Sequence, residues 1–258
     1  MLCQILGRIV FVSAMCWNSL GYTEEPEEAI LLPEVEVRAT HDSHFEAASQ
    51  YTVTEQDIEL QASDRPANVL RMVPGLITTN PGGGPGKPDN YMLRGFDADH
   101  GTDLAGFLDG MPLNLRSHAH GQGYLDLNFL IPETMKRVDA YKGPYQVQFG
   151  DFATAGAVNF VTRDVVEEGV VQLSGGQFNT QRHLLMFSPT TDTVRSLVAL
   201  EGFYTDGPYV NPNRALRANG LAKATMNPTT HSELSLIGTY YQGRWNSQGE
   251  IPLRAVES

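Results

Sequence analysis

The second half of the sequence contains runs in which hydrophobic and polar residues alternate, and this period of two predicts antiparallel β-strands. The runs cover Val170–Ser174, His183–Phe187, Ser196–Phe203, Leu221–Met226 and Glu233–Tyr241. Gly, Pro, Asn and Asp residues separate them, a spacing typical of a transmembrane β-barrel, and a soluble sandwich is the alternative. Five strands cannot close a wide barrel, and lipid does not tolerate open sheet edges, so we expect the sequence to continue beyond residue 258.

The first half is organised around two short apolar strands, Tyr91–Phe96 and Ala105–Asp109, each ended by a glycine turn at Gly95 or Gly110. Arg94 stands inside the first apolar run, so we expect its guanidinium to meet a carboxylate, because an unpaired buried charge is costly. The alternative is an ordinary β-hairpin whose arginine reaches the solvent.

The segments around these strands predict a mixed α+β domain. Capping-box chemistry over residues 54–57 predicts a short helix through about residue 61. Ser63 or Asp64 begins a second helix, with Pro66 in its first turn. The apolar face of this second helix is formed by Val69, Leu70 and Val73. The remaining predicted elements are a strand over Leu76–Thr79, a helical turn and strand within Leu130–Pro144, and a final apolar strand within Val147–Thr162.

The amino terminus resembles a secretory signal. Arg8 precedes the apolar run Ile9–Met15, and we assign residues 1–21 to the signal peptide, with a buried first helix as the alternative. The two cysteines, Cys3 and Cys16, both lie in this segment, so a processed chain needs no disulfide. No other segment reaches the ~20 apolar residues of a membrane-spanning helix.

Charge and motifs exclude several functions. The formal net charge of −12 argues against a nucleic-acid surface. The glycine-rich run at residues 81–88 is not a phosphate-binding loop, because its spacing is one residue short and Pro88 stands where Ser or Thr would bind magnesium. A G-x-S-x-G motif, a paired-carboxylate cleft and a cysteine nucleophile in the processed chain are all missing, so we do not expect an enzyme.

A short extended segment follows the signal. In Leu31–Thr40, Pro33 cannot donate a ladder hydrogen bond, and Val35 and Val37 alternate with charged residues. This pattern suits a strand that adds itself to the sheet edge of another protein, and the alternative is the first strand of the local domain.

Six stretches in this order resemble the N-terminal part of a TonB-dependent outer-membrane receptor. They are L-P-E-V-E-V-R-A-T at 32–40 (the TonB box), V-L-R-M-V-P-G-L at 69–76, M-L-R-G-F at 92–96, F-L-D-G-M-P at 107–112, R-V-D-A-Y-K-G-P at 137–144 and F-G-D-F-A-T-A-G-A-V-N-F-V-T at 149–162. The resemblance covers residues 32–258 and implies three parts after the predicted signal peptide (1–21). These are a periplasmic leash with the TonB box (22–45), an α+β plug domain (46–164, called the plug region below) and the first strands of an antiparallel transmembrane β-barrel (165–258).

The resemblance also implies a function. Such a receptor imports a scarce ligand, with a metal chelate such as a ferric siderophore as the leading candidate. It is energised by the TonB–ExbB–ExbD complex, sits in the outer-membrane lipid of a Gram-negative bacterium and carries no resident cofactor. The TonB-binding residues would be Leu32, Pro33, Val35 and Val37, and those of the plug ionic lattice Arg94, Arg137 and Asp139. Asp139 and Lys142 depart from the usual glutamate and arginine, and partners of the lattice can lie outside this sequence.

Candidate ligand-binding residues gather in two loops of the plug region. They are His100, Arg116, His118, His120 and Gln122. His118 and His120 are two residues apart, so an extended segment would point both to one side, where they could bind zinc, copper or iron. Asp97, Asp99 and Asp103 flank His100 with further oxygen ligands. The alternative is a polar loop that touches an organic ligand or water. A soluble periplasmic plug-like binding module and a receptor for a free metal or a glycan stay open beside the chelate receptor.

Overall fold

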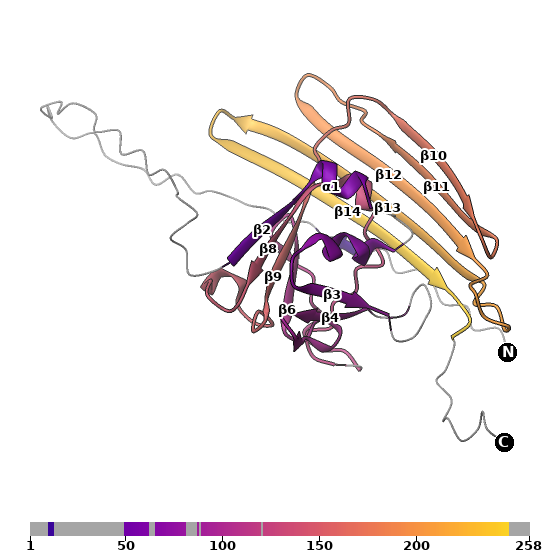
Figure 1. Ribbon diagram of the computed structural model, residues 1–258. Coiled ribbons are helices and arrows are strands. Elements are labelled where there is room, and N and C mark those ends of the chain that lie inside the picture. Colours follow the sequence, from indigo (N-terminus) through magenta and orange to yellow (C-terminus); the bar gives the residue numbers. More distant parts are fainter. Residues whose placement is uncertain are drawn as a thin grey trace, which may run out of the picture.

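The computed structural model describes residues 49–61, 65–80, 87, 89–119 and 121–247, together with the backbone of one short strand, β1 (Val10–Val12). The predicted signal peptide and TonB box, including Leu32, Pro33, Val35 and Val37, otherwise lie outside the described residues, as does His120. The described chain forms three sheets and a few short helical turns (Figure 1).

The second half of the chain forms one antiparallel sheet, called the wall sheet, in the order β1-β14-β13-β12-β11-β10. Its long strands are β10 (Val170–Gly176), β11 (Thr180–Phe187), β12 (Val194–Thr205), β13 (Ala215–Thr229) and β14 (Ser232–Arg244). All five strands were predicted by alternation, and each is longer than its apolar run, because ladder hydrogen bonds continue into the polar residues on both sides.

Alternation places one face of the wall sheet against the plug region and the other face outward. On β13, Arg217, Asn219, Leu221 and Lys223 are buried, while Leu216 is exposed on the outer face. Figure 1 shows the plug region packed against one face of the long, tilted strands. The inner face therefore includes charged side chains at positions that a soluble sandwich would fill with apolar ones.

The plug region contains a five-stranded and a three-stranded sheet. The larger sheet has the order β2-β8-β9-β6-β7, with β2 (Ser49–Thr54), β6 (Leu104–Leu108), β7 (Met111–Pro112), β8 (Met135–Lys142) and β9 (Gly156–Thr162). The smaller has the order β3-β4-β5, with β3 (Leu76–Thr79), β4 (Asn90–Leu93) and β5 (Phe96–Asp97). All pairings are antiparallel except β6 with β9.

Two tight turns correct the predicted strand limits. Arg94 and Gly95 have φ values of 53° and 80° and join β4 to β5, while Asp109 and Gly110, at 48° and 79°, join β6 to β7. Both pairs are two-residue hairpin loops of the kind whose twist matches that of the flanking strands. The expectation that Arg94 is buried within a strand is therefore wrong, because this residue occupies the turn itself and is exposed.

The helices form where the sequence predicts them, in shorter or tighter versions. α1 (Glu55–Glu59) begins with a capping box, in which Thr54 and Asp57 exchange side-chain-to-backbone hydrogen bonds. The second helix is a 3₁₀-helix, η2 (Pro66–Met72), not an α-helix, and Arg65 stands at its N-cap. Its predicted face is buried as expected. Three single 3₁₀ turns, η3 (Asp99–Gly101), η4 (Pro132–Thr134) and η5 (Val147–Phe149), complete the plug region.

The main apolar core of the plug region involves its sheets and η2, and a smaller cluster forms around Phe107 and Ala157. The largest fully buried members of the main core are Tyr91, Phe160, Leu70, Leu104, Leu125, Leu127 and Met135. In the part of the chain that the structure describes, no helix is long and apolar enough to cross a membrane.

Candidate functional site

A six-residue segment of the plug region, Asn128–Glu133, makes the closest contacts with the wall sheet. The carbonyl oxygens of Asn128 and Leu130 accept hydrogen bonds from Asn219 Nδ2 on β13 at 2.9 and 3.4 Å. Ile131 packs into an apolar cluster on the wall sheet. Glu133, in η4, reaches β11. Successive residues of one short segment thus dock the plug region through backbone, apolar and charged groups.

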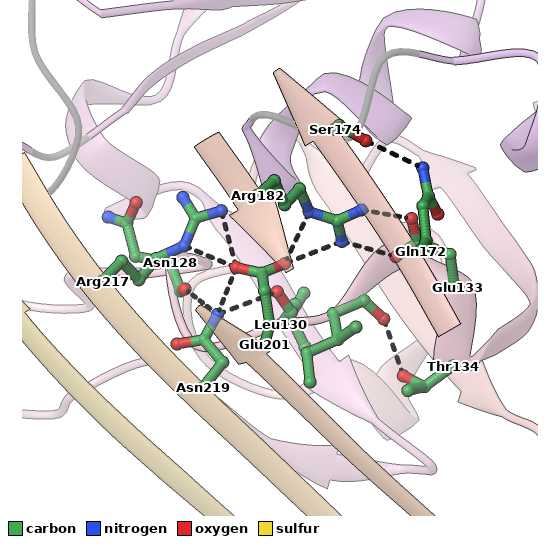
Figure 2. Close-up of polar contacts among 11 residues, drawn as sticks. Asn128, Leu130, Glu133, Thr134, Gln172, Ser174, Arg182, Glu201, Arg217 and Asn219 are labelled. Atoms are coloured by element: carbon green, nitrogen blue, oxygen red, sulfur yellow. Dashed lines mark hydrogen bonds and ion pairs between the residues drawn. The ribbon is translucent and has the colours of Figure 1, made fainter. Parts of the chain in front are cut away.

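The charged part of this contact is centred on Glu201 of β12, whose side chain is fully buried. Arg182 on β11 donates to Glu201 Oε2 from Nε and Nη2 at 3.1 and 2.7 Å. Arg217 on β13 contacts Glu201 Oε1 from Nε and Nη2 at 2.9 and 2.8 Å. Figure 2 shows Glu201 between the two guanidinium groups. We call these three residues the wall cluster.

Strand register explains this arrangement. Phe203 pairs with both Arg182 and Arg217 across the ladders, so the three residues form one row on the inner face. Glu201 lies two residues earlier on β12, on the same face, where it reaches both arginines diagonally. Arg217 also lies over the Phe203 ring, 4.7 Å from its centroid.

Glu133 joins the wall cluster from the plug region. Its two carboxylate oxygens accept hydrogen bonds from Arg182 Nη1 and Nη2 at 2.7 and 2.8 Å, a two-point ion pair. With Glu133 in place, two arginines balance two glutamates; without it, the wall cluster carries one net positive charge. The neutrality of this buried group therefore depends on the seating of the plug region.

A second ionic contact involves Lys223 on β13. Its ammonium lies 2.8 Å from Asp164, 3.3 Å from Asp109 in the β6–β7 turn, and 3.0 Å from Thr162 Oγ1. Asp109 also accepts a hydrogen bond from the Thr162 backbone at 2.8 Å, which fixes the turn against the end of β9. Here too the wall supplies the cation and the plug region the carboxylate.

Two hollows lie between the plug region and the wall sheet. The larger, of 1270 Å³, extends to Arg195 and Glu233, and the smaller, of 430 Å³, extends to Gly176 and Thr180. The residues shared by both linings are Glu59, Glu133 and Arg163. Arg163 pairs with Glu55 at 2.7 Å and with Glu59 at 3.6 Å. The hollows are therefore neighbours, separated by ion pairs.

The predicted lattice residues are only partly brought together. Arg137 Nε lies 2.9 Å from Asp139 Oδ2, and Thr52 donates to the other oxygen of Asp139. Arg94 is elsewhere, and no carboxylate among the described residues pairs with it. The ammonium of Lys142 lies 6.0 Å from the centroid of the Tyr51 ring, and burial, followed by the charge of Arg94, lowers the pKa of Lys142.

Three of the predicted ligand residues, Arg116, His118 and Gln122, lie in one loop that is closed at its base between Leu115 and Tyr124. Backbone hydrogen bonds join Leu115 and Tyr124 at its base, and Asn114 anchors it, with Nδ2 donating to three carbonyl oxygens, those of Gly101, Leu104 and Gly123. Arg116 and Gln122 are exposed on this loop. The His118 ring stacks on the Tyr124 ring, with centroids 4.2 Å apart, and His120 lies outside the described residues.

Two residues near this stack were not named by sequence reasoning. Tyr124 contacts His118 directly. Asp126 accepts hydrogen bonds from the backbone and the side chain of Asn128, each at 2.8 Å. Burial raises the pKa of Asp126, against the opposing effects of these hydrogen bonds and of the charges of His118 and Arg217.

His100 is held inside the plug region by its own contacts, and its predicted role in ligand binding stays a prediction. It sits in η3, its side chain is largely buried, and its Nδ1 donates to the Asp89 carbonyl oxygen at 2.9 Å. Among the described residues, no group of three or more His, Cys, Asp or Glu side chains is placed to hold a metal ion, so Asp97, Asp99 and Asp103 do not assemble a site with His100. Ligation by His118 with His120 stays a prediction.

Comparison with known families gives the plug region an identity. Residues 44–157 match the family model described as TonB-dependent Receptor Plug Domain. This chain carries a TonB-dependent receptor plug domain. The plug continues directly into the wall sheet, so the fold is that of a plug followed by antiparallel strands, with part of a barrel present.

Solved structures share this fold over most of the chain. The ferric yersiniabactin uptake receptor FyuA from Yersinia pestis matches with a TM-score of 0.60 and 18% identity, covering 78% of this chain and 32% of that one. The copper transporter OprC gives 0.59 and 18%, covering 78% and 31%. The pyoverdine outer membrane receptor FpvA from Pseudomonas aeruginosa PAO1 gives 0.58 and 20%, covering 76% and 27%. The chain thus spans about a third of the length of these proteins.

Proposed function

We propose that the protein works as a TonB-dependent outer-membrane receptor that imports a scarce ligand, with a metal chelate such as a ferric siderophore as the leading candidate. The observation that carries this proposal is the seating of a plug domain on the inner face of barrel-type strands through exchangeable ion pairs. Energy from the TonB–ExbB–ExbD complex would reach the plug through the box at residues 32–40.

Uptake in cells tests the role of this box. In the full-length receptor, Val37→Pro removes a ladder hydrogen bond, so we expect loss of energised uptake of a ferric siderophore while ligand binding to isolated membranes is retained. Val37→Thr keeps the backbone N–H and is the matched control. Normal uptake by the proline variant would refute the assignment of the box.

The loop at residues 115–124 is our candidate for the ligand-facing surface. It is anchored at its base, and its exposed tip contributes little to the apolar core, so its side chains are available to a ligand. Titration of the full-length receptor with ferric siderophores and with free Fe, Cu or Zn should show weaker binding for the His118→Ala/His120→Ala variant. Ser117→Ala is the control, and equal affinities for both variants would remove the histidines from the site.

We propose an ionic lattice for the plug that differs from the predicted one in the residues that form it. Arg94 and Lys142 both belong to the plug, and among the described residues no ion pair joins either of them to a carboxylate. We assign both to the lattice, with carboxylates from the rest of the receptor as their partners, and keep Arg137 and Asp139 as a pair internal to the plug.

A further inference from the structure

The two hollows between plug and wall sheet extend toward opposite ends of the strands. Gly176 and Thr180 flank the β10–β11 turn, whereas Arg195 and Glu233 lie near the starts of β12 and β14. Because successive strands of an antiparallel sheet alternate in direction, these two sets of residues belong to opposite ends of the wall sheet. The hollows together therefore follow the plug–wall boundary over much of its length, with Glu133 and Arg163 between them.

Arg182 stands at this junction and is held from two sides. Glu201 binds its Nε edge from the wall sheet, while Glu133 binds its Nη1–Nη2 end from the plug. The wall contact does not involve the plug, so Arg182 keeps its position when the plug moves. Its free end would then present two parallel N–H donors to the hollow, the geometry that binds a carboxylate or another planar oxyanion.

Charge distribution favours the same solute class. At the junction, the inner face of the wall sheet carries Arg182, Arg217 and Lys223 against Glu201, whereas the plug presents Glu133 and Asp109 to it. The carboxylates that the wall side adds to the larger hollow, those of Glu167, Glu168 and Glu233, lie away from Arg182. Withdrawal of the plug carboxylates therefore leaves a local cationic patch beside the widened gap. Such a patch in a confined space attracts anions and repels cations.

We propose that the Nη1–Nη2 end of Arg182 is a transit site for an anionic solute, and that Glu133 occupies this site while the plug is seated. The proposal rests on the proposed receptor function and narrows the imported ligand to one that carries a carboxylate or similar oxyanion. Glu133 then has two roles: it holds the plug against the wall sheet, and its carboxylate occupies the position on Arg182 that the anionic group of the ligand would take.

Permeation through the full-length receptor in liposomes tests the site with three sugars of similar size: gluconate, glucose and glucosamine. Glu133→Ala frees Arg182, so we expect gluconate to enter on the order of tenfold faster than glucosamine, with glucose between them. In Glu133→Ala/Arg182→Gln this preference should disappear while entry remains. Glu168→Ala removes an exposed carboxylate from the larger hollow, away from the junction, and should behave as the wild type.

Three results would overturn the proposal. They are a Glu133→Ala receptor as tight as the wild type, equal entry of gluconate and glucosamine, or the same gain in Glu168→Ala. If Glu133→Ala does not fold, Glu133→Gln replaces it, since it keeps the shape and loses the charge. Energised siderophore uptake by wild-type cells, measured in parallel, reports on the receptor function separately, because passive anion preference does not require TonB.

Discussion

The interior of the plug and its contact with the wall sheet are built from different chemistry. Inside the plug, Tyr91, Leu70 and Phe160 are sealed from water within one apolar cluster. At the wall, the plug contributes the carboxylates Glu133 and Asp109, backbone carbonyl groups and the apolar anchor Ile131. When an apolar core is opened to water, the favourable free energy of apolar burial is lost. Ion pairs and hydrogen bonds, by contrast, can be replaced by hydrogen bonds to water.

This difference separates two properties of the plug. We call the stability of its own apolar core cohesion, and the stability of its contacts with the wall sheet attachment. A force on the plug can break the wall contacts one after another while the apolar core stays closed. Attachment should therefore be sensitive to single substitutions of the charged residues that make these contacts, and cohesion to single substitutions of core residues. The following variants test this separation, from the largest expected effect to the smallest.

Phe160→Ala should damage cohesion. Phe160 is fully buried in the core, and truncation leaves a cavity, so we expect the free energy of unfolding of the plug to fall by about 4 kcal/mol. Hydrogen exchange of the β8 and β9 amides measures it. Leu60→Ala, at a side chain 83% exposed, is the control and should change stability by less than ~0.5 kcal/mol. Similar losses in both variants would refute the assigned core.

Arg182→Leu should damage attachment and spare cohesion. It leaves Glu133 and Glu201 without this partner in a buried setting, at a cost of about 3 kcal/mol. We expect faster exchange in Asn128–Glu133 and unchanged exchange in β8 and β9. Arg195→Leu breaks two exposed pairs, with Glu233 within the wall sheet and, at 3.6 Å, with Asp164, and should cost less than ~1 kcal/mol. Faster exchange throughout the plug would show that attachment and cohesion are one unit.

The sequence predicts cohesion better than attachment. The capping box of α1, the two glycine turns and all five wall strands follow from local patterns, and the structure confirms them. One local prediction was wrong: Arg94 belongs to a turn, because a two-residue hairpin loop starts one residue before Gly95. The predicted second helix is present as the 3₁₀-helix η2, and its buried face is the predicted one.

The wall contacts could not be found by local reasoning, because Glu133 and Arg182 are far apart in the sequence and meet only through the tertiary fold. One signal was present. Arg182 alternates with Leu184 and Met186 on the buried face of β11, and Glu201 and Lys223 occupy equivalent positions on their strands. Charged residues at inward-facing positions of an alternating strand indicate a polar partner on the inner side.

Lys223→Met should weaken the second attachment point by about 1–2 kcal/mol, less than the loss of Arg182, because Asp109 and Asp164 can regain water. Exchange in the β6–β7 turn reports the effect. Lys136→Met, at an exposed lysine of the same hollow, is the matched control. No difference between the two variants would remove Lys223 from the attachment.

Acidification should produce the smallest effect, through Asp164. Burial raises the pKa of Asp164, but hydrogen bonding and charge from Lys223, with the charge of Arg195, lower it further, so the net pKa is below its usual value of 3.8. A carboxyl group with a lowered pKa in the folded protein stabilises the fold above the unfolded value and loses this contribution as the pH falls through the folded value. We therefore expect the stability advantage of the wild type over Asp164→Asn to be constant above about pH 5 and to shrink below about pH 4. Thermal unfolding of both proteins across this range measures the difference.

Asp57→Asn, which removes another carboxyl group of lowered pKa, acts inside the plug at the α1 capping box and serves as the control for cohesion. An advantage that stays constant down to pH 2 would mean that Asp164 contributes no charge-dependent attachment at all.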